Sequence, residues 1–207
     1  MELVFVHGWG SGPFVWKDMI DDFSDHQCHM VNLGFSGEEK LTVPESKFVG
    51  IGHSLGGAWL LKHYPNRLLG FVSVASFNCF YDHIPAQIIS KMQKNIAKDV
   101  AAQVQDFWHH AGLDQPGGFK ELKPLKLAEG LMWLKKWKSD IPEDIPLKIL
   151  ASYDDYIVPE KMTQDIWGDY GVIWRNDGGH MLPITQPEWC IENIKEFLNE
   201  FKAQRKN

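Results

Sequence analysis

The amino-acid sequence predicts an α/β protein with a mostly parallel central sheet, helices on both faces and a helical insertion. Short apolar, β-rich runs alternate with helical patterns along most of the 207 residues. Such alternation is typical of parallel sheets, whose crossover helices cover both faces. The stretch 77–140 departs from it, because it contains helical patterns and no good strand. We therefore expect a core of 1–76 and 141–207 and a helical cap of 77–140.

Hydrophobic periodicity and turn residues give the bounds of the expected elements. The first strand runs into a Gly-rich loop, and the second core helix stops at Pro65. Within the cap, two helical patterns cover about 88–107 and 127–137. The predicted strands are 2–7, 29–33, 47–52, 68–76, 147–152 and 171–175. The predicted core helices are 14–23, 54–64, 160–167 and 187–202.

Composition excludes several classes of protein. A hydrophobic fraction of 44% with 13% aromatic residues is too high for a disordered or collagen-like chain. The net charge of −6 argues against nucleic-acid binding. No apolar run approaches the roughly 20 residues of a membrane helix, and no basic leader segment is present. Together with three widely spaced cysteines, which are expected to be reduced thiols, these features predict a cytoplasmic protein.

The central motif is Gly52-His53-Ser54-Leu55-Gly56, which matches G-x-S-x-G between a predicted strand and a predicted helix. A serine in a sharp strand-to-helix turn presents its hydroxyl above the sheet, and the glycines let the turn close. The helix N-terminus also favours developing negative charge. The alternative is an ordinary N-cap serine on a Gly-rich turn. The flanking strand and helix favour the nucleophile.

A serine nucleophile requires a base and an acid that orients the base. In enzymes with this type of turn the chain order is serine, acid, histidine. The strand 171–175 runs into a loop that ends at His180, whereas the eight other histidines precede the acid loop. The strand 147–152 runs into Asp154 and Asp155, and physical reasoning alone does not separate these two. Asp177, three residues before His180, is a weaker candidate for the acid.

An oxyanion hole requires two backbone N–H groups aimed at the developing charge. Leu55 follows the nucleophile and supplies the first N–H group. The loop His7-Gly8-Trp9-Gly10, after the first strand, offers the second at Trp9. A tight turn leaving the strand is the simpler interpretation of His7-Gly8 and is compatible with this role. We also expect Trp9 to form one wall of an acyl pocket.

These motifs together resemble the α/β-hydrolase superfamily over essentially the whole chain, and they imply the α/β-hydrolase fold. Finer phrases are similar to the pimeloyl-acyl-carrier-protein methyl ester esterase (BioH-type) family of biotin synthesis. The resemblance implies that Asp155, which is followed by two residues and then Val-Pro, is the acid. It also implies hydrolysis of a methyl ester on an acyl chain held by acyl carrier protein. The phrases are His7-Gly8-Trp9-Gly10 with Val15-Trp16, Gly34-Phe35-Ser36, Val74-Ala75-Ser76 with Cys79-Phe80, and Asp155-Tyr156-Ile157-Val158-Pro159.

The chain departs from the family pattern in three places. The usual antiparallel edge hairpin before the His-Gly loop is missing, and about a dozen residues replace the helix normally found before 47–52. The cap also lacks arginine, but its nine lysines against seven acidic residues give +2, which leaves −8 for the remainder. A cap less acidic than its base suits an acidic carrier protein. The lysines are explained equally well as the solvated outer face of two helices.

The predicted reaction is ester hydrolysis through an acyl-enzyme on Ser54, without a metal or organic cofactor. We expect apolar cap side chains to line an acyl channel with Trp9, although helix–helix packing explains most of them equally well. These cap residues are Met92, Ile96, Leu131 and Trp133. The alternatives are a general short-chain carboxylesterase, a menaquinone-pathway lyase of the same fold, and a non-catalytic α/β-hydrolase-like binding protein. The complete Ser-Asp-His set argues against the last of these.

Overall fold

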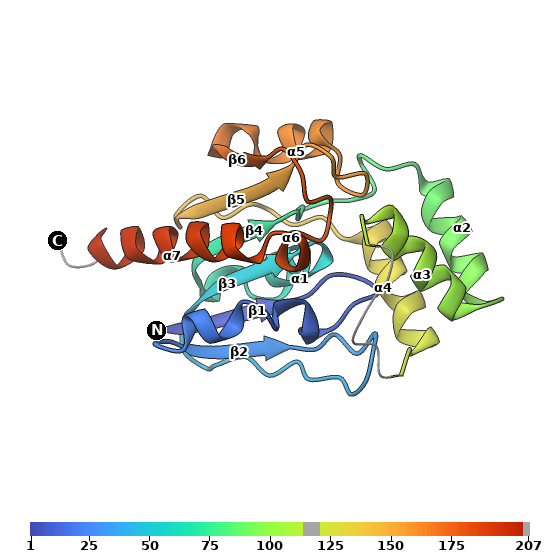
Figure 1. The fold of residues 1–207 in the computed structure, drawn as a ribbon, viewed down its shortest axis with the longest axis horizontal. Helices are drawn as coiled ribbons and strands as arrows, with labels where there is room; N and C mark the ends of the chain where they lie inside the picture. Colours follow the sequence, from blue (N-terminus) through green and yellow to red (C-terminus); the bar gives the residue numbers. More distant parts are fainter. Residues whose placement is uncertain (114–120, 205–207) are drawn as a thin grey trace.

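The computed structural model describes residues 1–113 and 121–204, and in them a single parallel sheet forms the core. Its six strands follow the order β2-β1-β3-β4-β5-β6. Every neighbouring pair is parallel, so all the carboxyl ends lie at one edge (Figure 1). The strands are β1 (Glu2–Val6), β2 (Gln27–Val31), β3 (Phe48–His53), β4 (Leu68–Val74), β5 (Leu147–Ser152) and β6 (Val172–Arg175). The parallel α/β architecture predicted from the sequence is therefore confirmed.

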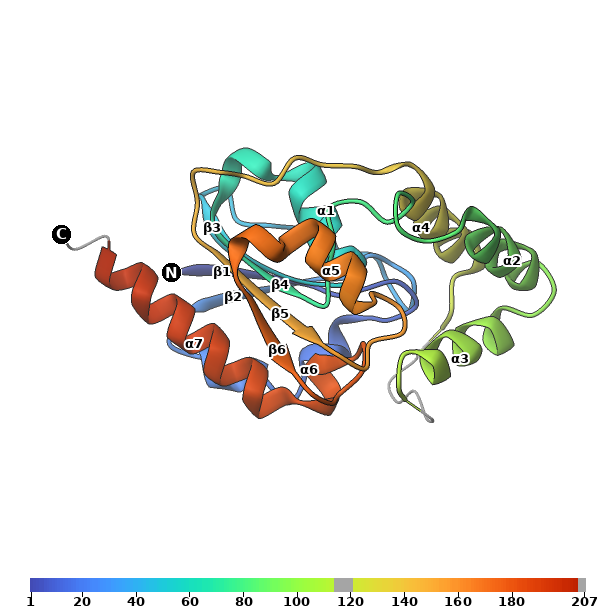
Figure 2. The same cartoon turned by 90° about the horizontal axis from the view of Figure 1, so that it is seen from above.

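Helices cover both faces of the sheet (Figure 2). One face carries α1 (Leu55–His63) and α5 (Glu160–Trp167). The opposite face carries the short helices η1 (Pro13–Trp16) and η2 (Ile20–Phe23), with α6 (Leu182–Thr185) and α7 (Pro187–Gln204). Two further 3-10 turns are η3 (Pro65–Arg67) and η4 (Gly168–Tyr170). With both faces covered, all six residues of β3 are buried, whereas the edge strands β2 and β6 are only partly buried.

The helix expected at 14–23 is instead two separate 3-10 turns. Its hydrogen bonds span three residues, from Lys17 N–H to Phe14 C=O and from Met19 N–H to Trp16 C=O. The spacing of three between the buried Trp16 and Met19 suits a 3-10 turn as well as an α-helix. Apolar spacing over so short a stretch therefore could not identify the helix type.

The segment between β4 and β5 contains α2 (Ala86–Ile96), α3 (Val100–His110) and α4 (Pro124–Lys136). These helices stand beyond the carboxyl ends of the strands (Figures 1 and 2). The pattern at 88–107, expected as one helix, is two. Asp99 interrupts it, because the Asp99 carboxylate accepts the Ala102 N–H at 3.0 Å and caps α3. We call α2, α3 and α4 the cap helices.

The cap helices rest on the loop that follows β1. The Trp9 indole N–H donates to the Leu127 carbonyl of α4 at 2.8 Å. The Trp108 indole N–H of α3 donates to the Gly10 carbonyl, also at 2.8 Å. At Gly130 of α4 an added Cβ would lie only 2.7 Å from the Phe35 ring. These contacts fix α3 and α4 directly above the carboxyl edge of the sheet.

Candidate active site

Ser54 lies in the turn between β3 and α1, at the carboxyl edge of the sheet. Its backbone has φ 54° and ψ −126°, in the left-handed region that costs a non-glycine residue free energy. Two hydrogen bonds hold this turn. The Ser54 N–H donates to the Val74 carbonyl at 3.0 Å, and the Ser76 hydroxyl donates to the Ser54 carbonyl at 2.5 Å. The sequence identified the turn but not Ser76 as its support.

The two glycines of the motif allow α1 to approach the sheet. An added Cβ at Gly52 would lie 2.3 Å from the Gly57 Cα. One at Gly56 would lie 2.1 Å from the Val6 carbonyl oxygen. Both distances are too short for any side chain, so the close approach depends on glycine. The N-terminus of α1 therefore begins directly beneath Ser54.

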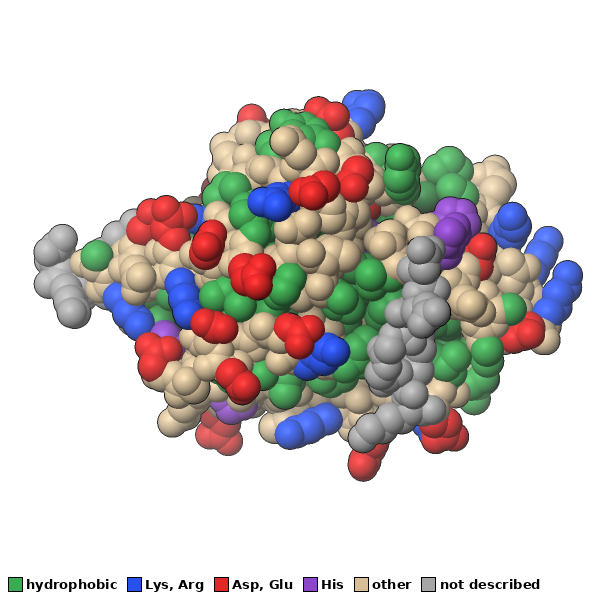
Figure 3. Space-filling view, viewed as in Figure 1, with side chains coloured by type: hydrophobic (Ala, Val, Ile, Leu, Met, Phe, Trp, Pro, Cys, Tyr) green, Lys and Arg blue, Asp and Glu red, His purple; other side chains and the backbone are tan. Residues whose placement is uncertain are grey.

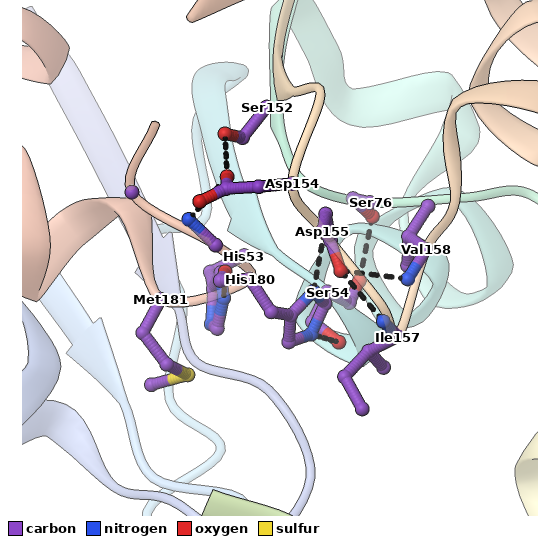
Figure 4. A network of polar contacts seen from close by, with 12 residues as sticks. His53, Ser54, Ser76, Ser152, Asp154, Asp155, Ile157, Val158, His180 and Met181 are labelled. Atoms are coloured by element: carbon purple, nitrogen blue, oxygen red, sulfur yellow. Dashed lines mark hydrogen bonds and ion pairs between the residues drawn. The ribbon is translucent and has the colours of Figure 1, made fainter. Parts of the chain in front are cut away.

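Ser54, His180 and Asp155 form a continuous hydrogen-bonded chain (Figure 4). The Ser54 hydroxyl donates to His180 Nε2 at 2.8 Å. His180 Nδ1–H donates to Asp155 Oδ2, also at 2.8 Å. The other oxygen of the Asp155 carboxylate accepts the N–H groups of Ile157 and Val158, each at 2.8 Å. Since all three side chains are buried, these bonds operate with little competition from water.

Asp154 has a different set of partners. Its Oδ1 accepts the Ser152 hydroxyl at 2.5 Å and the Gly179 N–H at 2.8 Å. Partial burial acts to raise the pKa of Asp154, but these hydrogen bonds outweigh it and lower the pKa below its ordinary value. Asp154 thus links the loop of Asp155 to the loop of His180. Sequence reasoning did not predict this link.

The loop after β1, which carries Trp9, passes against Ser54. An added Cβ at Gly8 would lie 2.8 Å from Ser54 Cβ. The Gly8 carbonyl accepts the Ser11 hydroxyl at 2.8 Å and His7 Nδ1–H at 2.9 Å. His7 Nε2 in turn accepts the Leu33 N–H at 3.0 Å. Two hydrogen bonds within the loop and one from Leu33 therefore hold it, with Trp9 next to the Ser54 turn and Leu55 at the start of α1.

A small cavity of about 100 Å³ opens beside Ser54. The cap helices supply several of its walls, and the acid loop and Trp9 supply others. Trp9 and Met92 line it, as the sequence led us to expect. Its remaining lining residues, which sequence reasoning did not identify, are Phe77, Phe80, Ile84, Ile88, Phe107, Leu134, Tyr156 and Ile157.

Three other residues expected at the channel lie outside this lining. Leu131 is fully buried within the hydrophobic core, and Ile96 is buried at the end of α2. Trp133 stacks on Trp137 with ring centroids 4.7 Å apart. Periodicity identified the apolar faces of these helices. It did not indicate which part of a face points toward Ser54, because that depends on how the helices are tilted.

Among the described side chains, no group of three His, Cys, Asp or Glu residues could hold a metal ion. Across residues 1–113 and 121–204, none of the helices combines the length and apolar character needed to cross a membrane.

Known proteins resemble the chain in sequence over nearly its whole length. The pimeloyl-acyl-carrier-protein methyl ester esterase of Proteus mirabilis is 29% identical, covering 93% of this chain and 90% of that protein. The enzyme of the same name from Aliivibrio fischeri is 27% identical, covering 96% and 94%. No protein-family model matches the chain.

Solved structures share the fold. A thermophilic esterase from Thermogutta terrifontis superposes with a TM-score of 0.78 at 16% identity, covering 97% of this chain and 90% of that one. A lipase-esterase related protein from Clostridium acetobutylicum gives 0.70 at 20% identity, covering 95% and 93%. The sheet order, the cap helices and these neighbours together define the α/β-hydrolase fold.

Within that class the chain is a carboxylic ester hydrolase, because its sequence relatives are esterases. It resembles the pimeloyl-acyl-carrier-protein methyl ester esterases in particular.

Two buried histidines near the site should make stability depend on pH. Burial is the main cause that lowers the pKa of His7 to about 4 and that of His53 to about 3. In the unfolded chain both return to about 6.5, so unfolding takes up protons below that pH. The stabilising effect of their neutral forms is complete above about pH 6.5 and decreases toward pH 4. From pH 7 to pH 5, each histidine should lower the free energy of unfolding by up to about 2 kcal/mol.

Urea unfolding at pH 7 and pH 5 measures this difference directly. A His7→Gln variant should lose about half of the pH dependence, since one of the two titrating groups is gone. The matched control is His110→Gln, which removes an exposed imidazole and should keep the full dependence. Equal free energies of unfolding for the wild type at the two pH values would contradict the assignment.

Proposed function

We propose that the protein is a serine carboxylesterase whose triad is Ser54, His180 and Asp155. The observation that carries the proposal is the pair of 2.8 Å hydrogen bonds joining Ser54 to His180 and His180 to Asp155. Asp155 accepts a hydrogen bond from Nδ1–H and so holds His180 in the tautomer whose Nε2 is free to receive the proton of Ser54. The bonds from Ile157 and Val158 fix the carboxylate and support this orientation.

The proposed reaction proceeds in two halves. Ser54 Oγ transfers its proton to His180 Nε2 and attacks the ester carbonyl carbon, and the N–H groups of Trp9 and Leu55 receive the oxyanion. The C–O bond to the alcohol breaks, and the Nε2 proton passes to the departing alcohol oxygen. Water then gives a proton to Nε2 and attacks the acyl-enzyme. Release of the acid returns that proton to Ser54.

We propose that the substrate is the methyl ester of pimeloyl-acyl carrier protein, and that the enzyme acts in biotin synthesis in the cytoplasm. The near full-length similarity to enzymes of that name supports this assignment. The apolar side chains around the cavity suit an acyl chain rather than a charged group. Methanol is then the alcohol that leaves.

The small cavity favours a second candidate, a general short-chain carboxylesterase. Its volume of about 100 Å³ is small beside the roughly 300–1,000 Å³ of typical ligand pockets. A short acyl group fills such a space completely. A longer chain has to continue past the exposed rim, where Ile88 and Tyr156 are 49% and 81% exposed.

An acyl chain carried on an acidic protein requires a docking surface, and we propose the outer face of α2. Lys91 and Lys94 of α2, and Lys98 just past its end, are exposed, and among the described residues they form no ion pair. Lys126 and Lys138, by contrast, pair with Glu39 and Asp82 at 2.7 Å. Figure 3 shows basic side chains gathered at the cap end of the molecule. Unpaired lysines of this kind can attract an acidic partner without first breaking an internal pair.

Replacing the nucleophile tests the esterase function. Ser54→Ala should lower kcat for p-nitrophenyl acetate or butyrate by at least about 10⁴-fold, since the triad acts as a unit. Melting curves confirm that the variant is folded.

The same two proteins distinguish the candidate substrates when each is expressed in a strain lacking its own methyl ester esterase. Biotin-free growth restored by the wild type but not by Ser54→Ala supports the pimeloyl substrate, whereas growth restored by neither leaves the general carboxylesterase. Hydrolysis that persists in Ser54→Ala would refute the triad.

A pair of asparagine variants distinguishes the two neighbouring aspartates. Asp155→Asn should lower kcat by about 10⁴-fold with KM nearly unchanged, because the amide favours the wrong tautomer of His180. Asp154→Asn keeps an oxygen acceptor for the Gly179 N–H and should lower kcat less than about tenfold. Steady-state kinetics on p-nitrophenyl butyrate measure both. Equal losses in the two variants would contradict the assignment of Asp155 as the orienting acid.

Charge reversal tests the proposed docking surface. The triple variant Lys91→Glu, Lys94→Glu, Lys98→Glu should raise KM for a carrier-protein-linked ester about tenfold at low salt, and less at high salt. KM for p-nitrophenyl butyrate should not change. The control reverses two exposed lysines of the core, Lys47→Glu with Lys62→Glu, and should leave both values unchanged. An unchanged KM for the carrier-linked ester in the triple variant would exclude this face of α2.

A further inference from the structure

The loop that ends at His180 contains two glycines, whose backbone conformations are little restricted. Gly178 and Gly179 immediately precede the histidine, with φ of 119° and 61°. Glycine in this region has a wide choice of backbone conformations, so these residues do not by themselves fix the direction of the imidazole. The position of His180 therefore depends on what holds the backbone of the loop.

Hydrogen bonds from separate parts of the chain hold this backbone. The Gly178 carbonyl accepts the Thr185 hydroxyl at 2.7 Å, and the Gly179 N–H donates to Asp154 at 2.8 Å. The His180 N–H donates to the Ala111 carbonyl, just beyond α3, at 3.2 Å. The His180 carbonyl accepts His53 Nε2–H at 2.9 Å. The last two bonds hold the two backbone polar groups of the base itself.

His53 is unusual among these partners because it is an imidazole buried inside the core. It is 1% exposed, and its ring centroid lies 5.1 Å from that of His180. Its Nδ1 has no hydrogen-bond partner in the described structure. Burial, together with the charge of a protonated His180, lowers the pKa of His53 to about 3. The ring is therefore neutral, and its single N–H is committed to the His180 carbonyl.

An apolar residue would fill the same space without leaving a buried nitrogen unpaired, a state that costs free energy. What the imidazole supplies in return is a rigid donor, aimed at the carbonyl of the base from the residue next to the nucleophile. A His180 displaced by 1 Å would lose alignment with Ser54, and misplacements of that size reduce rates by about 100-fold.

We propose that His53 is a positioning residue, whose Nε2–H fixes the His180 carbonyl and so holds the imidazole between Ser54 and Asp155. The proposal rests on the Ser54-dependent hydrolysis proposed above. His53 takes no part in bond making or proton transfer. It acts through the backbone of His180 alone.

A pair of nearly isosteric variants separates the donor from the volume of the side chain. His53→Gln keeps an N–H donor at a similar reach, whereas His53→Met fills similar space without one. The Met variant should lower kcat for p-nitrophenyl butyrate by about 10- to 100-fold with KM within about twofold, and Gln should restore kcat to within about threefold of wild type. His29→Gln, on the edge strand β2, is the control and should not change kcat.

Nuclear magnetic resonance provides a readout that a general loss of stability would not change. The downfield proton of His180 Nδ1–H should be retained in the wild type and in His53→Gln, and should broaden or shift in His53→Met. In the wild type, labelled His53 should be the Nε2–H tautomer and stay neutral at pH 5. This last measurement needs no variant and so stands even where a substitution prevents folding.

Three results would overturn the proposal. They are wild-type kcat in His53→Met, equal loss of kcat in the Met and Gln variants, and a wild-type His53 that carries its proton on Nδ1. A wild type without Ser54-dependent turnover would instead refute the proposed function. The tautomer of His53 and the His180 resonance in the variants would then still decide whether His53 holds His180.

Discussion

The site depends on how closely helix α1 is pressed against the sheet. A side chain at Gly56 would begin 2.1 Å from the Val6 carbonyl of β1, and one at Gly52 would collide with α1 itself. This approach forces Ser54 into its left-handed conformation and brings the first turn of α1 beneath the hydroxyl. Because every strand is parallel, the loops after β1, β5 and β6 begin at the same edge of the sheet. The site residues that these loops carry therefore lie close to Ser54.

The sequence predicted most of the core for the same physical reason. Strands buried on both faces are continuous apolar runs, and β5 and α5 were predicted at their observed bounds. Ser54 and His180 became candidates because the turn and the loop that carry them follow strands directly. The order Ser-acid-His left Asp154 and Asp155 open, since both follow the same strand, and only the family phrase favoured Asp155. In the structure the two differ in their contact with the His180 loop. Asp155 accepts a hydrogen bond from the His180 imidazole, whereas Asp154 accepts one from the Gly179 backbone.

The cap was harder to predict, because its details arise from tertiary contacts. An unbroken apolar period at 88–107 concealed the break at Asp99, where a single side-chain cap starts a new helix. The cavity lining was missed for a related reason. Leu134 lines the cavity and Leu131, three residues earlier on the same face of α4, does not. Helical period gives the face, whereas the tilt of α4 over Trp9 and Phe35 decides which residue reaches Ser54.

The cap also contributes to the site more directly than a cover would. The Ala111 carbonyl, one residue beyond α3, accepts the His180 N–H, and the indoles of Trp9 and Trp108 tie α4 and α3 to the loop after β1. A movement of α3 away from the sheet therefore breaks a bond to the base and a bond to the loop that carries Trp9. If substrate enters by such a movement, His180 loses this support while the cap is open. His180 and the loop after β1 therefore keep these hydrogen bonds only while α3 lies on the core.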